Sequence, residues 1–82
     1  MRSREIKVTS YSGYKDEESP LSFLIDDEKI GVVEVLKKWI EEEQGSRKIK
    51  RFFKVKGSDG YIHTLFYDEQ LKVWFLITGG TY

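Results

Sequence analysis

The chain has no cysteine, one histidine and one proline among its 82 residues. Without cysteine it can form neither a disulfide bond nor a thiolate metal site. One histidine cannot supply the several nitrogen or sulfur ligands that the usual zinc sites need. The composition therefore excludes a zinc enzyme and a cysteine hydrolase, and we expect no metal and no other cofactor.

Long apolar runs are also absent. The longest, Val73 to Ile77, is far shorter than the ~18 residues that indicate a membrane span, and no apolar stretch follows the two arginines near the start. A chain of this length can bury only one small core. We expect a single domain over residues 1–82, cytoplasmic and without a membrane partner, with a short flexible tail from about residue 79.

The net charge is zero, because fourteen basic side chains balance fourteen acidic ones. The balance hides a split, since residues 1–45 carry about −4 and residues 46–82 about +4. Six basic side chains lie within ten residues that contain no acid: Arg47, Lys48, Lys50, Arg51, Lys54 and Lys56. Dedicated nucleic-acid binders usually have an overall basic excess, so the balance argues against a general polyanion binder.

Turn residues predict how neighbouring segments pair in the second half of the chain. Gly57-Ser58-Asp59-Gly60 suits a type I turn closed by a left-handed glycine, with Ser58 to Gly60 as a three-residue hairpin loop. This loop places Val55 opposite His63 and Phe53 opposite Leu65.

Two further turns are predicted from shorter signals. A two-residue turn at Gln44-Gly45 gives apolar and opposite-charge pairs, namely Ile40 with Ile49, Leu36 with Phe53, Glu42 with Arg47 and Glu41 with Lys48. A turn at Glu69-Gln70 pairs Leu65 with Trp74 and His63 with Leu76.

The fold class that follows is all-β. Residues 6–9 alternate, and residues 21–25 run through Asp26-Asp27 into another short hairpin. Six antiparallel strands in a meander would close as a small SH3/OB-like barrel or a strongly bent sheet. The alternative is an α+β fold with a helix at residues 28–44, capped by Asp27 and ended by Gly45, although this segment is rich in β-branched residues.

A set of short motifs is spread along most of the chain, namely Ser10-Tyr11-Ser12-Gly13-Tyr14-Lys15, Pro20, Phe23, Glu34-Val35-Leu36, Trp39, Phe53-Lys54-Val55, Asp59-Gly60, Trp74 and Leu76. Together these motifs resemble a family of small bacterial cytoplasmic proteins of unknown function. Between Trp39 and Phe53 the chain departs from the pattern with what we expect to be an extended hairpin. The resemblance implies a compact domain in a bacterial cytoplasm and supplies no catalytic or ligand-binding residue.

The predicted registers divide the sheet into two faces. A core face would collect Leu36, Ile40, Ile49, Phe53, Val55, His63, Leu65, Trp74 and Leu76. An outer face would collect Val35, Trp39, Phe52, Thr64, Phe66, Val73 and Phe75 with Lys37, Lys48, Lys50, Lys54 and Lys56. Rings interleaved with lysines are what single-stranded nucleic acid requires, because bases stack on rings while ammonium groups neutralise phosphates.

Three interpretations of the outer face stay open. The N-terminal residues Ile6, Val8, Phe23 and Ile25 could cover it, it could bind a protein or a second copy, or it could bind single-stranded nucleic acid. The candidate partner-binding residues are Trp39, Lys48, Lys50, Phe52, Lys54, Lys56, Phe66 and Phe75. Burial of Phe52 and Trp39 would count against both binding hypotheses.

Few residues suggest catalysis. His63 has strand neighbours, Ile62 and Thr64, that cannot orient it as a base. The loop Tyr11-Ser12-Gly13-Tyr14 could cradle a small anion but lacks the spacing of a phosphate loop. We therefore expect a non-enzymatic protein-interaction module that binds another protein or a second copy of itself, with single-stranded nucleic-acid binding by residues 47–56 as the alternative.

Overall fold

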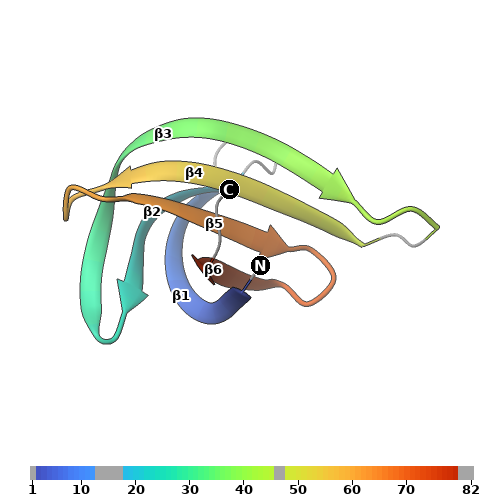
Figure 1. The fold of residues 1–82 in the computed structure, drawn as a ribbon, viewed down its shortest axis with the longest axis horizontal. Coiled ribbons are helices and arrows are strands. Elements are labelled where there is room, and N and C mark those ends of the chain that lie inside the picture. The colour runs from blue at the N-terminus through green and yellow to red at the C-terminus, as the bar shows by residue number, and fades with distance from the viewer. Residues whose placement is uncertain (1, 13–17, 46–47, 80–82) are drawn as a thin grey trace.

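Six antiparallel strands make up the fold in the computed structural model, which describes residues 2–12, 18–45 and 48–79 (Figure 1). The strands are β1 (Arg2–Ser12), β2 (Glu18–Ile25), β3 (Glu28–Glu42), β4 (Ile49–Gly57), β5 (Ile62–Asp68) and β6 (Val73–Gly79). Each pairs with the next, and β6 pairs with β1, so the sheet closes into a small barrel. This confirms the predicted all-β meander.

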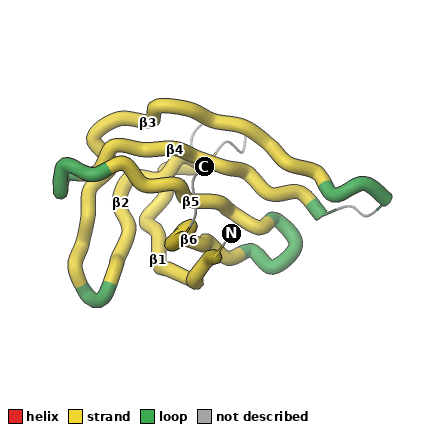
Figure 2. The backbone as a smooth tube through the Cα atoms, viewed as in Figure 1, coloured by secondary structure: helices red, strands yellow, loops and turns green. Residues whose placement is uncertain are grey.

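Two long strands make the closure possible. β1 pairs with β6 through its first half and with β2 through its second, while β3 pairs first with β2 and then with β4. The backbone trace shows both strands curving from one side of the barrel to the other (Figure 2). The helical alternative for residues 28–44 is wrong, because the β-branched residues of that segment occupy β3. Among the described residues no helix is long and apolar enough to span a membrane.

Two of the predicted hairpin turns are confirmed. In the β4–β5 turn the N–H of Gly57 donates to Tyr61 O at 2.8 Å, and Gly60 has a φ of 87°. Val55 lies opposite His63, as expected. In the β2–β3 turn Asp26 and Asp27 have φ values of 48° and 67°, the two positive φ angles of a type I′ turn.

The predicted two-residue turn at Gln44-Gly45 is wrong. The N–H of Glu43 donates to Lys48 O at 3.1 Å, so the loop spans residues 44–47, of which 46 and 47 lie outside the described residues. Gln44 has no positive φ, which a tight turn with glycine second would demand of it. The register moves by two residues, so Glu41 faces Lys50 and Glu42 faces Ile49. The expected pairing of Glu41 with Lys48 and of Glu42 with Arg47 is therefore wrong.

The predicted turn at Glu69-Gln70 is also wrong, and for a local reason. The Asp68 side chain accepts hydrogen bonds from the N–H groups of Gln70 and Leu71, both at 3.0 Å, and its backbone O accepts one from Lys72 at 2.7 Å. These bonds favour a four-residue loop that ends at Lys72, whose φ is 57°. Leu65 therefore faces Leu76 instead of Trp74.

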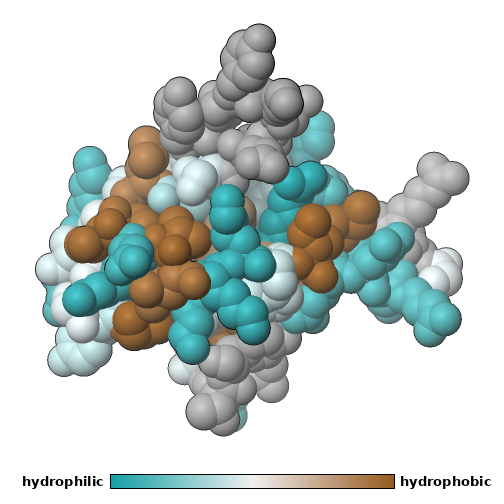
Figure 3. Space-filling view, turned by 90° about the horizontal axis from the view of Figure 1, so that it is seen from above, coloured by the Kyte–Doolittle hydropathy of each residue, from teal (hydrophilic) through white to brown (hydrophobic). Residues whose placement is uncertain are grey.

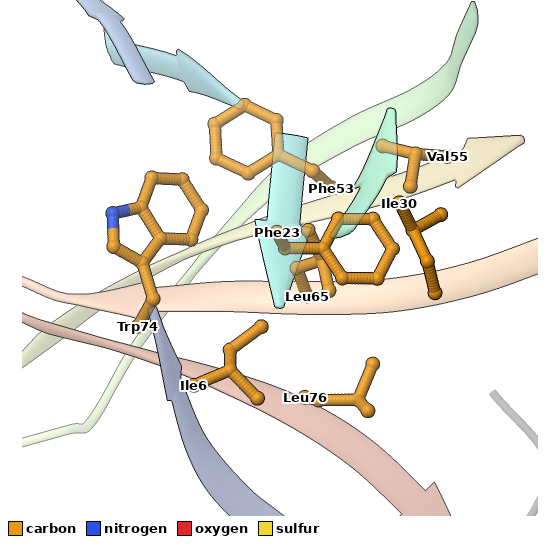
Figure 4. Close-up of a cluster of buried hydrophobic side chains, with 8 residues drawn as sticks. All are labelled: Ile6, Phe23, Ile30, Phe53, Val55, Leu65, Trp74 and Leu76. Atoms are coloured by element: carbon orange, nitrogen blue, oxygen red, sulfur yellow. The ribbon is translucent and has the colours of Figure 1, made fainter. Parts of the chain in front are cut away.

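The core lies inside the barrel (Figure 4). Its buried residues are Ile6, Phe23, Ile30, Phe53, Val55, Leu65, Trp74 and Leu76. Leu36 and Ile40 were expected here but are 44% and 61% exposed, and Val35 packs against the core although it was expected outside. Two β-bulges, at Val32/Glu34 and Val35/Lys37, each insert one residue into β3, so Val35 turns inward and Leu36 becomes the inserted residue of the second bulge. Ile40 keeps its expected face, opposite Arg51, but lies on the part of β3 that no longer pairs with β2 and is exposed there.

We predict that Gly57→Ala destabilises the fold by about 1–3 kcal/mol, because the added methyl group overpacks the site. Its Cβ would lie 2.5 Å from Asp59 Oδ1 and 2.9 Å from Ile30 Cγ2. The matched control is Gly31→Ala, whose Cβ would meet only Ser58, at 3.7 Å, in ordinary contact. Urea unfolding measures both variants. A Gly57→Ala protein as stable as the Gly31→Ala protein would contradict this account of the turn.

Candidate interaction surface

Four aromatic rings form a row across the outer face of the barrel. Trp39 of β3 faces Phe52 of β4, Phe52 faces Phe66 of β5, and Phe66 faces Phe75 of β6. Successive ring centroids are 5.1, 5.0 and 5.0 Å apart, with interplanar angles of 11°, 31° and 18°. This aromatic ladder, Trp39–Phe52–Phe66–Phe75, places side by side the four rings that the sequence analysis assigned to one face.

The two inner rings of the ladder are buried. Phe52 is 1% exposed and Phe66 is 4% exposed, whereas Trp39 and Phe75 are half-buried. Cover by the N-terminal strands, one of the three interpretations left open, does not occur at Ile6 and Phe23, because both lie in the core on the other side of the sheet. Neither Phe52 nor Phe66 presents a ring face to a base or to a partner in this conformation.

Two lysines lie over the ladder. Lys37 Nζ is 5.3 Å from the centroid of the Trp39 ring, and Lys50 Nζ is 5.3 Å from the centroid of the Phe66 ring. Both distances are typical of cation–π contacts. The register also places Lys50 between Glu41 of β3 and Asp68 of β5. The positive charge of Lys50 therefore lies opposite an acidic residue on each neighbouring strand.

The remaining lysines of the basic segment differ in their partners. Lys48 Nζ lies 3.9 Å from Glu43 Oε2, and Lys56 faces Glu34 across the β3–β4 ladder. Lys54 faces another base, Lys37. Like charges directly opposite each other in a sheet repel, so an anion bound between Lys37 and Lys54 would offset the repulsion of their ammonium groups.

The longest strand has an open edge. β2 pairs with β3 only from Glu28 to Gly31, whereas β4 pairs with it from Val32 to Glu42. No described strand pairs with the other edge of β3 over that second stretch. The end of the β3–β4 hairpin also projects beyond the β5–β6 turn (Figure 1). We call the edge from Lys37 to Glu42, past the last bulge, the arm edge.

The pattern of hydrogen bonds shows which residues point their backbone outward. The N–H of Glu43 donates to the O of Lys48, the residue before β4, so in this antiparallel ladder every second residue from Glu43, namely Glu41 and Trp39, also bonds to β4. The N–H and C=O groups of the residues between them face away from β4, and these are Lys38, Ile40 and Glu42. No hydrogen bond among the described residues uses these outward groups.

Lys38, Ile40 and Glu42 were not among the residues that the sequence predicted to form a site. One signal could have found them. β3 has 15 residues and β2 has 8, so a hairpin partner of that length must leave part of β3 unpaired on one side. The predicted burial of Ile40 concealed this, because it placed the residue in the core.

His63 has the orienting partner that its strand neighbours do not supply. Its Nε2 lies 2.9 Å from Asp59 Oδ2, and its ring packs edge-on against Phe23 with centroids 5.1 Å apart. Burial raises the pKa of Asp59, but the N–H of Tyr61 and the imidazole of His63 outweigh it, so that the pKa lies below its ordinary value. The pair fastens the β4–β5 turn to β2, and the expectation that His63 lacks a partner is corrected.

The other candidate sites carry less chemistry. Of the loop from Tyr11 to Tyr14, Gly13 and Tyr14 lie outside the described residues, while Tyr11 and Ser12 end β1 opposite Ser19 and Glu18. In the described part of the chain no group of three or more His, Cys, Asp or Glu side chains could hold a metal ion. A hollow of about 260 Å³ at the loop end of the β3–β4 hairpin is lined by charged residues, namely Glu41, Glu42, Glu43, Lys48 and Lys50.

Comparison with known proteins identifies no relative. No family model matches the chain, and neither a curated protein nor a solved structure matches it. The resemblance to small bacterial proteins of unknown function stays an expectation from the sequence motifs.

We predict that the Asp59 carboxylate stabilises the fold in a pH-dependent way. Because its pKa is lowered in the folded state, its contribution is complete above about 3.9, the ordinary pKa of Asp, and is lost as the pH falls through the lower folded value. Thermal midpoints of the wild type and Asp59→Asn are compared from pH 6 to pH 3. The wild type should melt higher at pH 5–6, and the difference should shrink below about pH 4. A difference that does not change with pH would refute the role of the charge.

Proposed function

We propose that the chain is a non-enzymatic protein-interaction module that binds by strand addition at the arm edge. The observation that carries the proposal is the row of outward backbone groups at Lys38, Ile40 and Glu42, which pair with no described strand. An extended segment can add to such an edge through main-chain hydrogen bonds. The bacterial cytoplasm implied by the sequence motifs is part of the same proposal.

Exposed apolar side chains on β3 support this choice over the aromatic ladder. Val33 is 64% exposed, Leu36 is 44% exposed and Ile40 is 61% exposed. In the view from above, hydrophobic residues form two groups on the surface, with hydrophilic residues between them (Figure 3). Main-chain bonds along an edge give affinity, and side chains at alternate positions give specificity. Ile40 offers both at one position.

The geometry offers less to an enzyme. A histidine oriented by a carboxylate needs a nucleophile or a substrate within reach of its second nitrogen. Among the described residues, the hydrogen bonds of the His63 ring go to Asp59 alone. The nearby Ser58 hydroxyl accepts the N–H of Gly31 at 2.9 Å and so holds the turn against β3. We assign both side chains to the turn.

The test uses a displayed library of random linear peptides selected on the wild-type protein. Ile40→Pro removes an N–H that points away from β4, so the fold should survive, as proline is tolerated at such edge positions. Selected peptides should bind Ile40→Pro at least about tenfold more weakly, measured by fluorescence polarisation. Ile40→Thr keeps the N–H and is the matched control. Peptides that bind Ile40→Pro as well as the wild type, or the absence of any selected peptide, would overturn the proposal.

Single-stranded nucleic acid is the second candidate, and the facing pair of Lys37 and Lys54 favours it. An oligonucleotide phosphate between the two ammonium groups would relieve their repulsion. Affinity should fall as salt rises, with a slope of about −0.7 per phosphate contacted, and Lys54→Ala should reduce that slope by about 0.7. Lys29→Ala, which removes an exposed charge beside β2, is the control and should leave the slope unchanged. Binding that does not respond to salt would exclude this candidate.

A further inference from the structure

The arm edge carries its charges in opposite order on the two sides of Ile40. Lys37 and Lys38 stand three and two positions before that residue, and Glu42 and Glu43 stand two and three positions after it. The bases at positions 37 and 38 and the acids at positions 42 and 43 are therefore placed symmetrically about Ile40. In an antiparallel pair of two copies, the bases of one copy can then lie opposite the acids of the other.

Two-fold symmetry restricts the possible registers of such a pair. An axis perpendicular to the sheet relates the two copies, so the residue on the axis faces itself and the residues before it face those after it. With Ile40 on the axis, Lys38 faces Glu42 of the second copy and Lys37 faces Glu43 of the second copy. Every lysine of the segment then faces a glutamate, and the two exposed Ile40 side chains cover each other.

The backbone fits the same register. Residues that exchange hydrogen bonds across an antiparallel pair must point their N–H and C=O groups at each other. With Ile40 on the axis these pairs are Ile40 with itself and Lys38 with Glu42, which are the residues whose groups face away from β4. The stretch from Lys37 to Glu42 has no bulge, so the edge is regular enough to pair.

Neighbouring registers match fewer charges. With Trp39 on the axis only Lys37 meets an acid, Glu41, and Lys38 faces Ile40. With Lys38 or Glu41 on the axis, two like charges meet at the centre, which is destabilising. Charged edge strands usually prevent association because one sign repels itself. Here the sign reverses about Ile40, so the same charges favour the pairing of two copies.

We propose that the occupant of the arm edge is a second copy of this chain, paired antiparallel with Ile40 at the two-fold axis. This inference rests on the proposed function of strand addition and names its partner. The two sheets would join through β3, so that one continuous sheet runs from β6 of one copy to β6 of the other. The contact is small, and we expect it to form in the micromolar range.

Charge swaps test the register in sedimentation experiments from micromolar to millimolar concentration. Lys38 and Glu42 face Phe53 and Ile49 across the β3–β4 ladder, so reversing their charges places no like charge directly opposite them inside one copy. Lys38→Glu alone and Glu42→Lys alone should each weaken the dimer by about tenfold or more, because like charges then face each other. The double variant restores the opposite-charge pairs and should restore the dimer. Circular dichroism checks that every variant is folded.

The outcomes separate the two proposals. A wild-type chain that stays monomeric at every concentration, or a double variant that remains as weak as the single ones, overturns the second copy as partner. A monomeric chain whose arm edge still binds displayed peptides in a manner sensitive to Ile40→Pro retains the proposed function. In the dimer, amide hydrogen exchange at Lys38, Ile40 and Glu42 should slow as concentration rises, and exchange that does not depend on concentration overturns the pairing.

Discussion

The bend of β3 is the feature on which the rest of the structure depends. Bulges at Val32/Glu34 and Val35/Lys37 turn the strand from its pairing with β2 to its pairing with β4. The first pairing brings Phe23 and Ile30 over the core, and the second places Phe53 and Val55 beneath them. The same bend carries the far half of β3 away from β2, so it both closes the barrel and leaves the arm edge unpaired.

A second layer of packing lies outside the barrel. The interior of an 82-residue chain is small, and the aromatic ladder adds buried rings on the opposite face of the same strands. Lysine stems cross these rings at Trp39 and Phe66 and keep their ammonium groups at the surface. Rings interleaved with lysines, which resemble a nucleic-acid surface in the sequence, are here largely a packed layer. The open main-chain edge is the better candidate for recognition.

Much of the fold could be predicted because strand faces repeat every two residues. The two wrong turns each moved a register by two positions, which leaves every side chain on its predicted face. Phe52, Phe66 and Phe75 were therefore placed together correctly, although Phe66 faces Phe75 and not Val73. The bulges could not be predicted, because they insert single residues and exchange the faces. For that reason Leu36 was misplaced in the core and Val35 outside it, whereas Ile40 lies on its predicted face but beyond the buried cluster.

The sequence by itself determined the six strands, the β4–β5 register and the side of the sheet that holds the rings, since these follow from turn chemistry and from a period of two. It also contains the reversal of charge about Ile40, which is a property of residue order alone. Only the tertiary structure decided which of these features are accessible. Barrel closure limits β2 to four residues of β3, from Glu28 to Gly31, and so leaves Lys38, Ile40 and Glu42 as an edge. The packing of ring on ring then buries Phe52.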